Sequence, residues 1–149
     1  MSRAGPSDDA GFTLLEVLLA LTVLSLAAVA LGPHLAAGAE RGSVVRTLSL
    51  LDSALAGART AALQGRTVVV TLDLDRRHIR SSVDNRWRVW PSNVRIETRT
   101  AHELGPPHQP VIVFLADGTS SGARIQVRAG TYESIRNIAW LTGAITHGE

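Results

Sequence analysis

A long apolar run near the start of the chain constrains its architecture more than any other feature. The run extends over twenty residues, 12–31, and its polar interruptions are Thr13, Glu16, Thr22 and Ser25. A helix of this length is about 30 Å long, which matches the hydrocarbon core of a bilayer. We therefore predict a transmembrane helix over residues 12–31, followed by enough chain for one further domain.

Glu16 occupies an unfavourable position within this apolar run. A carboxylate in hydrocarbon costs about 2.5–3.5 kcal/mol, so it requires a positively charged partner at the same depth. Cleavage between Gly11 and Phe12 would create such a partner, the new α-amino group of Phe12. In a helical array, Glu16 of one subunit could pair with the Phe12 amine of its neighbour. Because a misaligned subunit would leave both charges unpaired, Glu16 is predicted to set the register of assembly.

The sequence G-F-T-L-L-E at residues 11–16, followed by an apolar helix, resembles the class III signal of type IV pilins and type II secretion pseudopilins. The resemblance implies that a prepilin peptidase removes residues 1–11 as a leader, cuts after Gly11 and N-methylates Phe12. It also implies a single-pass protein of the bacterial inner membrane whose C-terminal domain lies in the periplasm. The leader departs from the family pattern, because Asp8 and Asp9 stand where a basic residue usually lies near the cut.

Three other interpretations of the N-terminal segment remain. The first is a secretory signal peptide that is cut among the small residues 36–39, although the apolar run exceeds the usual length of about 7–15 residues. The second is a plain signal anchor, in which Glu16 has no function. In the third, Glu16 is a tolerated polar residue that reaches the membrane interface.

The helical pattern continues beyond the membrane segment, over residues 32–65. Gly32-Pro33 is expected to kink or locally melt the helix, because proline lacks a backbone donor. Apolar residues then recur at alternating spacings of four and three, which predicts one buried stripe along the helix: Val44, Leu48, Leu51, Leu55, Ala58 and Ala62. Gly65 is the predicted end of the helix.

After Gly65 the apolar period changes to two, which predicts an antiparallel β domain over residues 66–149. The expected strands are 67–74, 78–82, 94–99, 111–115, 124–128, 135–140 and 144–146. Residues 111–115 are apolar throughout, which favours a strand that is buried on both faces. The proline-rich segment 104–110 is expected to be a loop outside the sheets.

The C-terminal region resembles the domain that is shared by minor pseudopilin H of type II secretion and FimT-like minor pilins. The matching segments are residues 114–122, 124–128 and 140–143. The resemblance implies a pilin-like α+β fold in which a long N-terminal helix packs on two antiparallel sheets. It implies a minor pseudopilin at or near the tip of the type II secretion pseudopilus, supporting export of folded proteins. The implied partners are the prepilin peptidase, the major and other minor pseudopilins, and the inner-membrane assembly platform.

An alternative function is that of a FimT-like minor pilin that binds DNA during uptake. The strand alternation places four arginines on the outward face of the sheet: Arg95, Arg99, Arg124 and Arg128. If their strands are neighbours, these arginines would form a basic surface that could bind phosphate backbones. The competing interpretation is a solvated face that is balanced by Glu97 and other acidic residues.

Other patterns suggest chemistry but are better explained as structure. Residues 118–122 match the G-x-S-x-G nucleophile elbow of hydrolases, yet a strand pattern rather than a helix follows, so we predict a tight turn and no enzyme. The five histidines show no metal-ligand spacing, and Asp73 and Asp75 lack the further oxygen ligands of a calcium loop, so both are expected to face solvent. Cysteine is absent, and no metal or cofactor is predicted.

Overall fold

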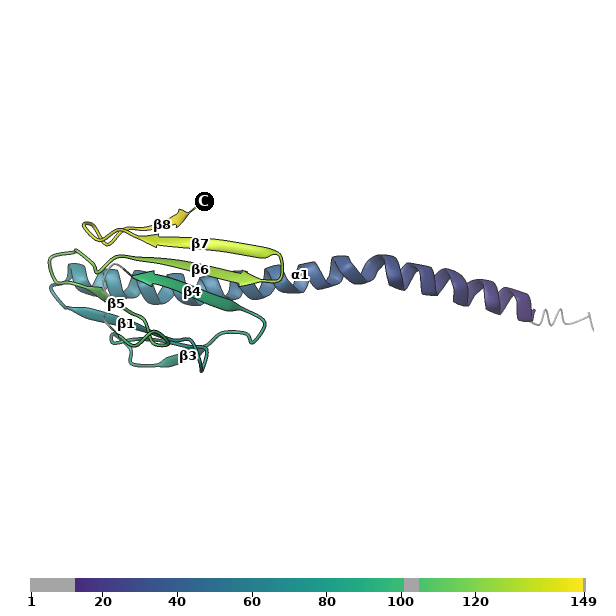
Figure 1. The fold of residues 1–149 in the computed structure, drawn as a ribbon, viewed down its shortest axis with the longest axis horizontal. Coiled ribbons are helices and arrows are strands. Elements are labelled where there is room, and N and C mark those ends of the chain that lie inside the picture. Colours follow the sequence, from purple (N-terminus) through teal and green to yellow (C-terminus); the bar gives the residue numbers. More distant parts are fainter. Residues whose placement is uncertain (1–12, 101–104, 149) are drawn as a thin grey trace, which may run out of the picture. The chain divides into compact units, whose positions relative to one another are not determined.

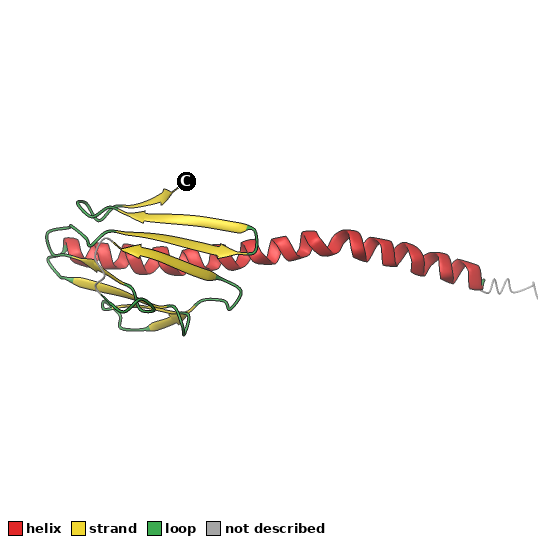
Figure 2. Ribbon diagram, viewed as in Figure 1, coloured by secondary structure: helices red, strands yellow, loops and turns green. Residues whose placement is uncertain are grey.

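One long helix and two antiparallel sheets make up the part of the chain that the structure describes. The structure is a computed structural model that describes residues 13–100 and 105–148, except for the side chains of residues 31–36. Its elements are α1 (Leu14–Leu63), β1 (Val68–Asp73), β2 (His78–Ser81), β3 (Trp87–Val89), β4 (Arg95–Thr100), β5 (Val111–Phe114), β6 (Ala123–Ala129), β7 (Tyr132–Ile138) and β8 (Ile145–Gly148) (Figures 1 and 2). The chain divides into two compact units, Met1–Ala36 and Ala37–Glu149. The predicted α+β class is confirmed.

The helix α1 is continuous from Leu14 to Leu63, so the expected melting at Gly32-Pro33 is wrong. Pro33 removes one backbone donor, but the alanine-rich sequence on both sides favours the helix. As predicted, Gly65 terminates the helix: it lies just beyond Leu63 and has a φ of 82°. Gly65 N–H donates to the carbonyl of Ala62, and Arg66 N–H donates to that of Ala61. This pair of bonds is a Schellman motif, which requires the left-handed conformation that glycine adopts most easily.

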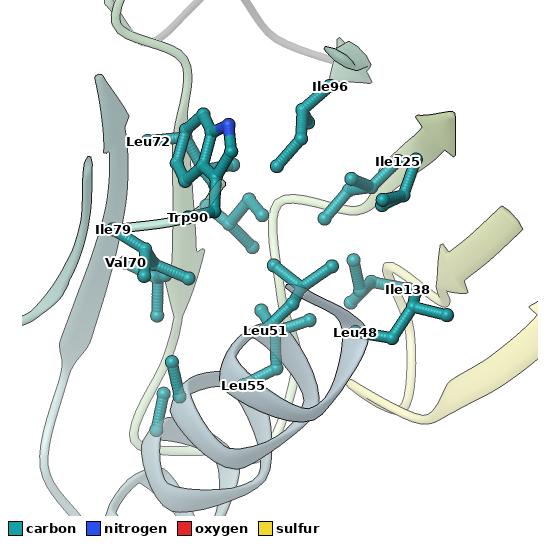
Figure 3. Packing of buried hydrophobic residues seen from close by; sticks show 14 of the residues in the cluster. Leu48, Leu51, Leu55, Val70, Leu72, Ile79, Trp90, Ile96, Ile125 and Ile138 are labelled. Carbon is teal, nitrogen blue, oxygen red and sulfur yellow. The ribbon is translucent and has the colours of Figure 1, made fainter. Parts of the chain in front are cut away.

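The predicted apolar stripe of α1 forms the centre of the core. Leu51, Leu55 and Ala58 have at most 1% of their surface exposed, whereas Arg46, Ser53 and Thr60 lie outside the stripe and are exposed. Figure 3 shows the stripe meeting inward side chains from both sheets: Val70, Leu72, Ile79, Ile96, Ile125 and Ile138. The helix therefore supplies the apolar surface that both sheets cover.

The first sheet has the strand order β3-β2-β1-β5. Val68, Val70 and Leu72 of β1 face the core, as the alternation predicted. The expectation that residues 111–115 are buried on both faces is wrong. β5 lies at the edge of this sheet, where Ile112 and Phe114 are buried but Val111 and Val113 are only half-buried. Leu115 is exposed, because no element described here packs on the outer face of β5.

The second sheet has the strand order β4-β6-β7-β8 and packs on the same helix (Figure 1). Ser120 and Ser121 link the two sheets. Ser121 N–H donates to the carbonyl of Val113 in β5, while Ser120 N–H donates to the carbonyl of Trp140 beyond β7. The short segment that follows β5 therefore carries the chain from one sheet to the other.

An ion pair ties α1 to the second sheet. Arg136 of β7 is buried and donates two parallel hydrogen bonds to Asp52, with Nε–Oδ1 at 2.9 Å and Nη2–Oδ2 at 3.0 Å. A second contact lies near the β6–β7 turn, where the Arg41 guanidinium lies 5.4 Å from the centre of the Tyr132 ring. These polar contacts fix the orientation of the helix against the sheet in a way that apolar packing alone does not.

Candidate functional site

Glu16 lies in the first turn of α1, and Thr13 caps the start of this helix, which the sequence analysis did not predict. The backbone N–H of Glu16 donates to the hydroxyl of Thr13 at 3.3 Å and to the Thr13 carbonyl at 3.0 Å. Thr13 is thus the N-cap, and T-x-x-E is the pattern of a capping box. The signal was present in the sequence but was read only as part of the cleavage motif.

The two residues that flank the predicted cut, Gly11 and Phe12, lie outside the described residues. Cleavage after Gly11, methylation of Phe12 and pairing of the Phe12 amine with Glu16 therefore stay predictions. The carboxylate of Glu16 itself lies on an exposed part of the helix. It is accessible to a partner from a neighbouring molecule.

The first part of α1 exposes apolar side chains around its whole circumference. Leu14 is 79% exposed and Val29 is 78% exposed, and the large apolar residues between them are exposed as well. Thr22 and Ser25 donate their hydroxyl hydrogens to the carbonyls of Leu19 and Leu21, at 2.7 and 2.8 Å. A helix that is apolar all round is normally surrounded by other apolar groups, and internally bonded hydroxyls are compatible with such surroundings.

Within the residues that the structure describes, no helix meets the combined length and apolarity needed to cross a membrane.

The structure brings the four predicted arginines together on the second sheet. β4 pairs with β6 so that Arg95 lies opposite Arg128 and Arg99 lies opposite Arg124, and all four are exposed. Like charges that face each other across a strand pair are unfavourable. Acidic residues offset them, because Glu97 lies between the two pairs and Glu133 of β7 binds Arg128 at 3.5 Å.

This arginine face, defined as Arg95, Arg99, Arg124 and Arg128, has mixed charge at its centre. A hollow of about 460 Å³ there is lined by two of the arginines and also by Glu97 and Glu133. The side-chain amide of Gln126 donates to the Glu133 carboxylate. The face therefore matches the balanced, solvated interpretation as well as it matches a phosphate-binding one.

Asp73 corrects one prediction. It was expected to face solvent, but only 3% of its surface is exposed. Its Oδ1 accepts from the Arg76 backbone N–H at 2.9 Å, and its Oδ2 accepts from Gln109 Nε2 at 3.1 Å. The carboxylate is buried because it caps the β1–β2 turn and holds the proline-rich loop. Asp75 is exposed as expected.

The G-x-S-x-G segment forms the predicted tight turn. Gly118 and Gly122 have φ values of 87° and 68°. The hydroxyl of Ser120 donates to the Ala139 carbonyl at 3.0 Å and accepts from Gly122 N–H at 3.1 Å. A strand, β6, follows rather than a helix, so Ser120 has the environment of a turn residue.

The histidines are distributed over separate parts of the fold. His78 makes an edge-on contact with Trp87, with ring centres 5.9 Å apart, and His108 and His147 are exposed. His102 lies outside the described residues, as does the side chain of His34. In the described ranges, no three His, Cys, Asp or Glu side chains gather where they could hold a metal ion.

Two comparisons with known proteins found similarities, one in the N-terminal segment and one in the fold. Residues 6–32 match the prokaryotic N-terminal methylation motif. The fold is similar to that of the minor pseudopilin EpsH from the type 2 secretion system of Vibrio cholerae, with a TM-score of 0.53 and 13% sequence identity. The similarity covers 71% of this chain and 96% of that one. None of the curated proteins compared with the chain matches it.

These findings give the chain a prepilin-type N-terminus and the fold of a minor pseudopilin.

Proposed function

We propose that the chain is a minor pseudopilin of a type II secretion system, assembling at or near the tip of the pseudopilus. The observation that carries the proposal is the combination of two features on one chain. The methylation motif covers residues 6–32, and the following helix and two sheets have the fold of a minor pseudopilin. Growth of the filament from the inner membrane would move folded proteins toward the outer-membrane channel.

The proposal includes an anchor in the bacterial inner membrane, with the sheet domain in the periplasm. Its support is the exposed apolar surface on the first part of α1, from Leu14 to Val29. Lipid would cover that surface before assembly, and the helices of neighbouring subunits would cover it afterwards. The same proposal assigns the partners as the prepilin peptidase, the major and other minor pseudopilins, and the inner-membrane assembly platform.

The role of Glu16 follows from this arrangement. Its carboxylate would pair with the methylated amine of Phe12 on a neighbouring subunit, so that only the correct stagger leaves no charge unpaired in an apolar environment. Because Glu16 also occupies the capping-box position of α1, an alanine variant would confound two effects. Glutamine separates them, since it retains the capping function but has no charge.

The experiment uses Glu16→Gln in the full-length chain, produced together with a complete secretion system. Mass spectrometry of the mature N-terminus is expected to show cleavage after Gly11 and a methyl group on Phe12 in both wild type and variant. The variant is expected to be lost from sheared filaments. The matched control is Thr13→Ala, which removes the cap hydroxyl without changing charge and should still assemble.

Two results would contradict the proposal at different levels. Normal incorporation of the glutamine variant would remove the charge-pairing role of Glu16. An intact Met1, or a mature terminus near Ala39, would remove the prepilin assignment itself.

We propose no catalysed reaction for this chain. The Ser120 hydroxyl already donates to one backbone carbonyl and accepts from one backbone N–H, which is a structural use. The purified chain is expected to hydrolyse no p-nitrophenyl ester above the rate of its Ser120→Ala variant. A rate that depends on Ser120 would contradict this part.

A further inference from the structure

A groove lies between the free edge of the second sheet and the adjoining face of α1. Its volume is about 360 Å³, and its walls come from one side of α1 and from β7 and β8. The helix contributes Ala56, Arg59, Thr60 and Leu63, and β8 contributes Ile145 and His147. Leu63 is 62% exposed although it is a large apolar residue. All of these residues belong to the compact unit Ala37–Glu149.

The strand that borders the groove has an open edge. β8 is the last strand in the order β4-β6-β7-β8, and it pairs with β7 alone among the described strands (Figure 1). Beyond the ladder, Ala139 N–H donates to the carbonyl of Ala144. Hydrogen-bonded pairs alternate along an antiparallel ladder, so the backbone groups of Ile145 and His147 point away from β7. Each of these residues therefore offers one N–H and one C=O at the edge.

The side chains at this edge point toward the helix. Ile145 lies opposite Ile138 and His147 lies opposite Arg136 in the ladder, and both of those β7 residues are buried on the helix side. A strand added beside β8 would therefore place its own inward side chains against Ala56, Thr60 and Leu63. That is the part of the helix surface that the second sheet leaves uncovered.

Arg59 adds a positive charge to the groove, and it forms no ion pair within the residues that the structure describes. Asp52 is already bound by both guanidinium nitrogens of Arg136 that face it. Arg59 has a single long contact, from Nη2 to the Thr142 carbonyl at 3.5 Å. In the described part of the chain, its Nε–H is shielded from solvent and has no hydrogen-bond partner. A buried donor without an acceptor is costly, so the Arg59 side chain is poorly satisfied in its present position, and a carboxylate in the groove would offer its guanidinium charge-assisted bonds.

We propose that this groove is a docking site for an extended segment of another protein, which adds to the second sheet as a fifth strand beside β8. One inward side chain of that segment is an Asp or Glu that binds Arg59, and its inward neighbours are apolar. Backbone bonds to Ile145 and His147 provide the attachment, and the carboxylate provides the selection. A second copy of this chain fits poorly, because it would bring its own Arg59, Arg136 and His147 to the same place. The inference does not depend on the proposed secretion role.

The probe for this site is a capped seven-residue peptide in which threonine alternates with valine, with glutamate at the central inward position. A matched peptide carries glutamine there. Both are titrated into the full-length chain in detergent micelles, and the backbone amide signals of Ile145 and His147 are followed by NMR. The glutamate peptide is expected to bind about tenfold more tightly, the size of one charge-assisted bond.

Two variants test the two parts of the proposal. Arg59→Gln is expected to bind both peptides with equal affinity. His147→Pro removes an edge N–H that makes no bond to β7, so the sheet should persist while both peptides lose binding. The matched control is Thr146→Ala. The Thr146 side chain lies on the opposite face of β8, so this variant should bind both peptides as the wild type does.

Three results would overturn the proposal. The first is equal affinity of the wild type for the two peptides, and the second is no binding of either peptide. The third is self-association of the chain through β8, seen by sedimentation as a dimer that His147→Pro abolishes, which would identify the occupant as a second copy. An unchanged melting temperature of each variant confirms that loss of binding is not loss of folding.

Discussion

The ion pair between α1 and the second sheet gives the most direct test of what holds the two together. Asp52→Asn removes the negative charge but nearly preserves the shape of the side chain. The Arg136 side chain is 6% exposed and would remain buried, without the carboxylate that now accepts two of its hydrogen bonds. Its Nη1 still donates to the Ser134 hydroxyl at 3.1 Å and to the Ile135 carbonyl at 3.2 Å.

The expected loss of stability in Asp52→Asn depends on how far each partner of the ion pair is buried. Removing one partner of a fully buried ion pair costs roughly 3–5 kcal/mol. Asp52 is 40% exposed, so solvent already screens part of the interaction and can hydrate the freed guanidinium from the groove. Together with the two remaining acceptors, this reduces the expected loss to about 2 kcal/mol. Domains of this size are stable by about 5–15 kcal/mol, so the loss is measurable but does not unfold the protein.

Urea unfolding of the full-length chain, followed by tryptophan fluorescence, measures this loss. Trp90 is 3% exposed and reports on the core. The variant should unfold at a lower urea concentration with an unchanged slope, and its melting temperature should fall by about 8 °C. Asp75→Asn is the matched control, because Asp75 is exposed and its replacement should cost under about 0.5 kcal/mol. If Asp52→Asn is no more destabilising than Asp75→Asn, the ion pair does not fix α1 against the sheet.

Two further predictions concern the β6–β7 turn of the second sheet and the turn that precedes β6. Gly130→Ala should lower the free energy of unfolding by about 1 kcal/mol, because φ is 53° at this position. The Glu40 carboxylate lies where the added Cβ would be, but it is the end of a flexible side chain and can rotate away. Equal stability of wild type and variant in urea would contradict this strain. Two hydrogen bonds lower the pKa of Asp117, first that from the Thr119 hydroxyl and next that from the Thr119 backbone N–H. They therefore stabilise the fold at a pH above the unfolded pKa of Asp117, and this stabilisation is lost as the pH falls through its folded pKa. Thr119→Val should raise the Asp117 pKa toward its ordinary value in an NMR titration of the carboxyl carbon, and an unchanged pKa would contradict the assignment.

Most of the fold could be predicted from local periodicity. The stripe of α1 was found because each of its residues needs only its neighbours one turn away to define a face. The strand β3 (Trp87–Val89) was missed, because three residues within an arginine-rich stretch give no alternation to recognise. The burial of Asp73 was also missed. It depends on Gln109, which lies 36 residues away, and no local pattern contains that contact.

The arginine face could be predicted in part from the sequence, and the groove beside β8 could not. Alternation placed Arg95 and Arg128 on outward faces. That they lie opposite each other depends on the pairing of β4 with β6, which the alternation within either strand does not reveal. The groove beside β8 could not be predicted from the sequence for a similar reason. Ile145 and His147 become edge residues only because no described strand follows β8 in the sheet.

The assembly role that we propose for Glu16 is compatible with its place in the first turn of α1, at the glutamate position of the T-x-x-E capping-box pattern. A carboxylate in an apolar helix is least unfavourable in the first turn, where unpaired backbone N–H groups and the positive end of the helix dipole are nearest. The cap hydroxyl of Thr13 lies beyond the predicted cut, so it survives cleavage and keeps α1 starting at the same residue. A carboxylate has acceptor sites for more than one donor. It can therefore support its own helix before assembly and still accept from the amine of a neighbouring subunit, so pairing would add a bond without first breaking one.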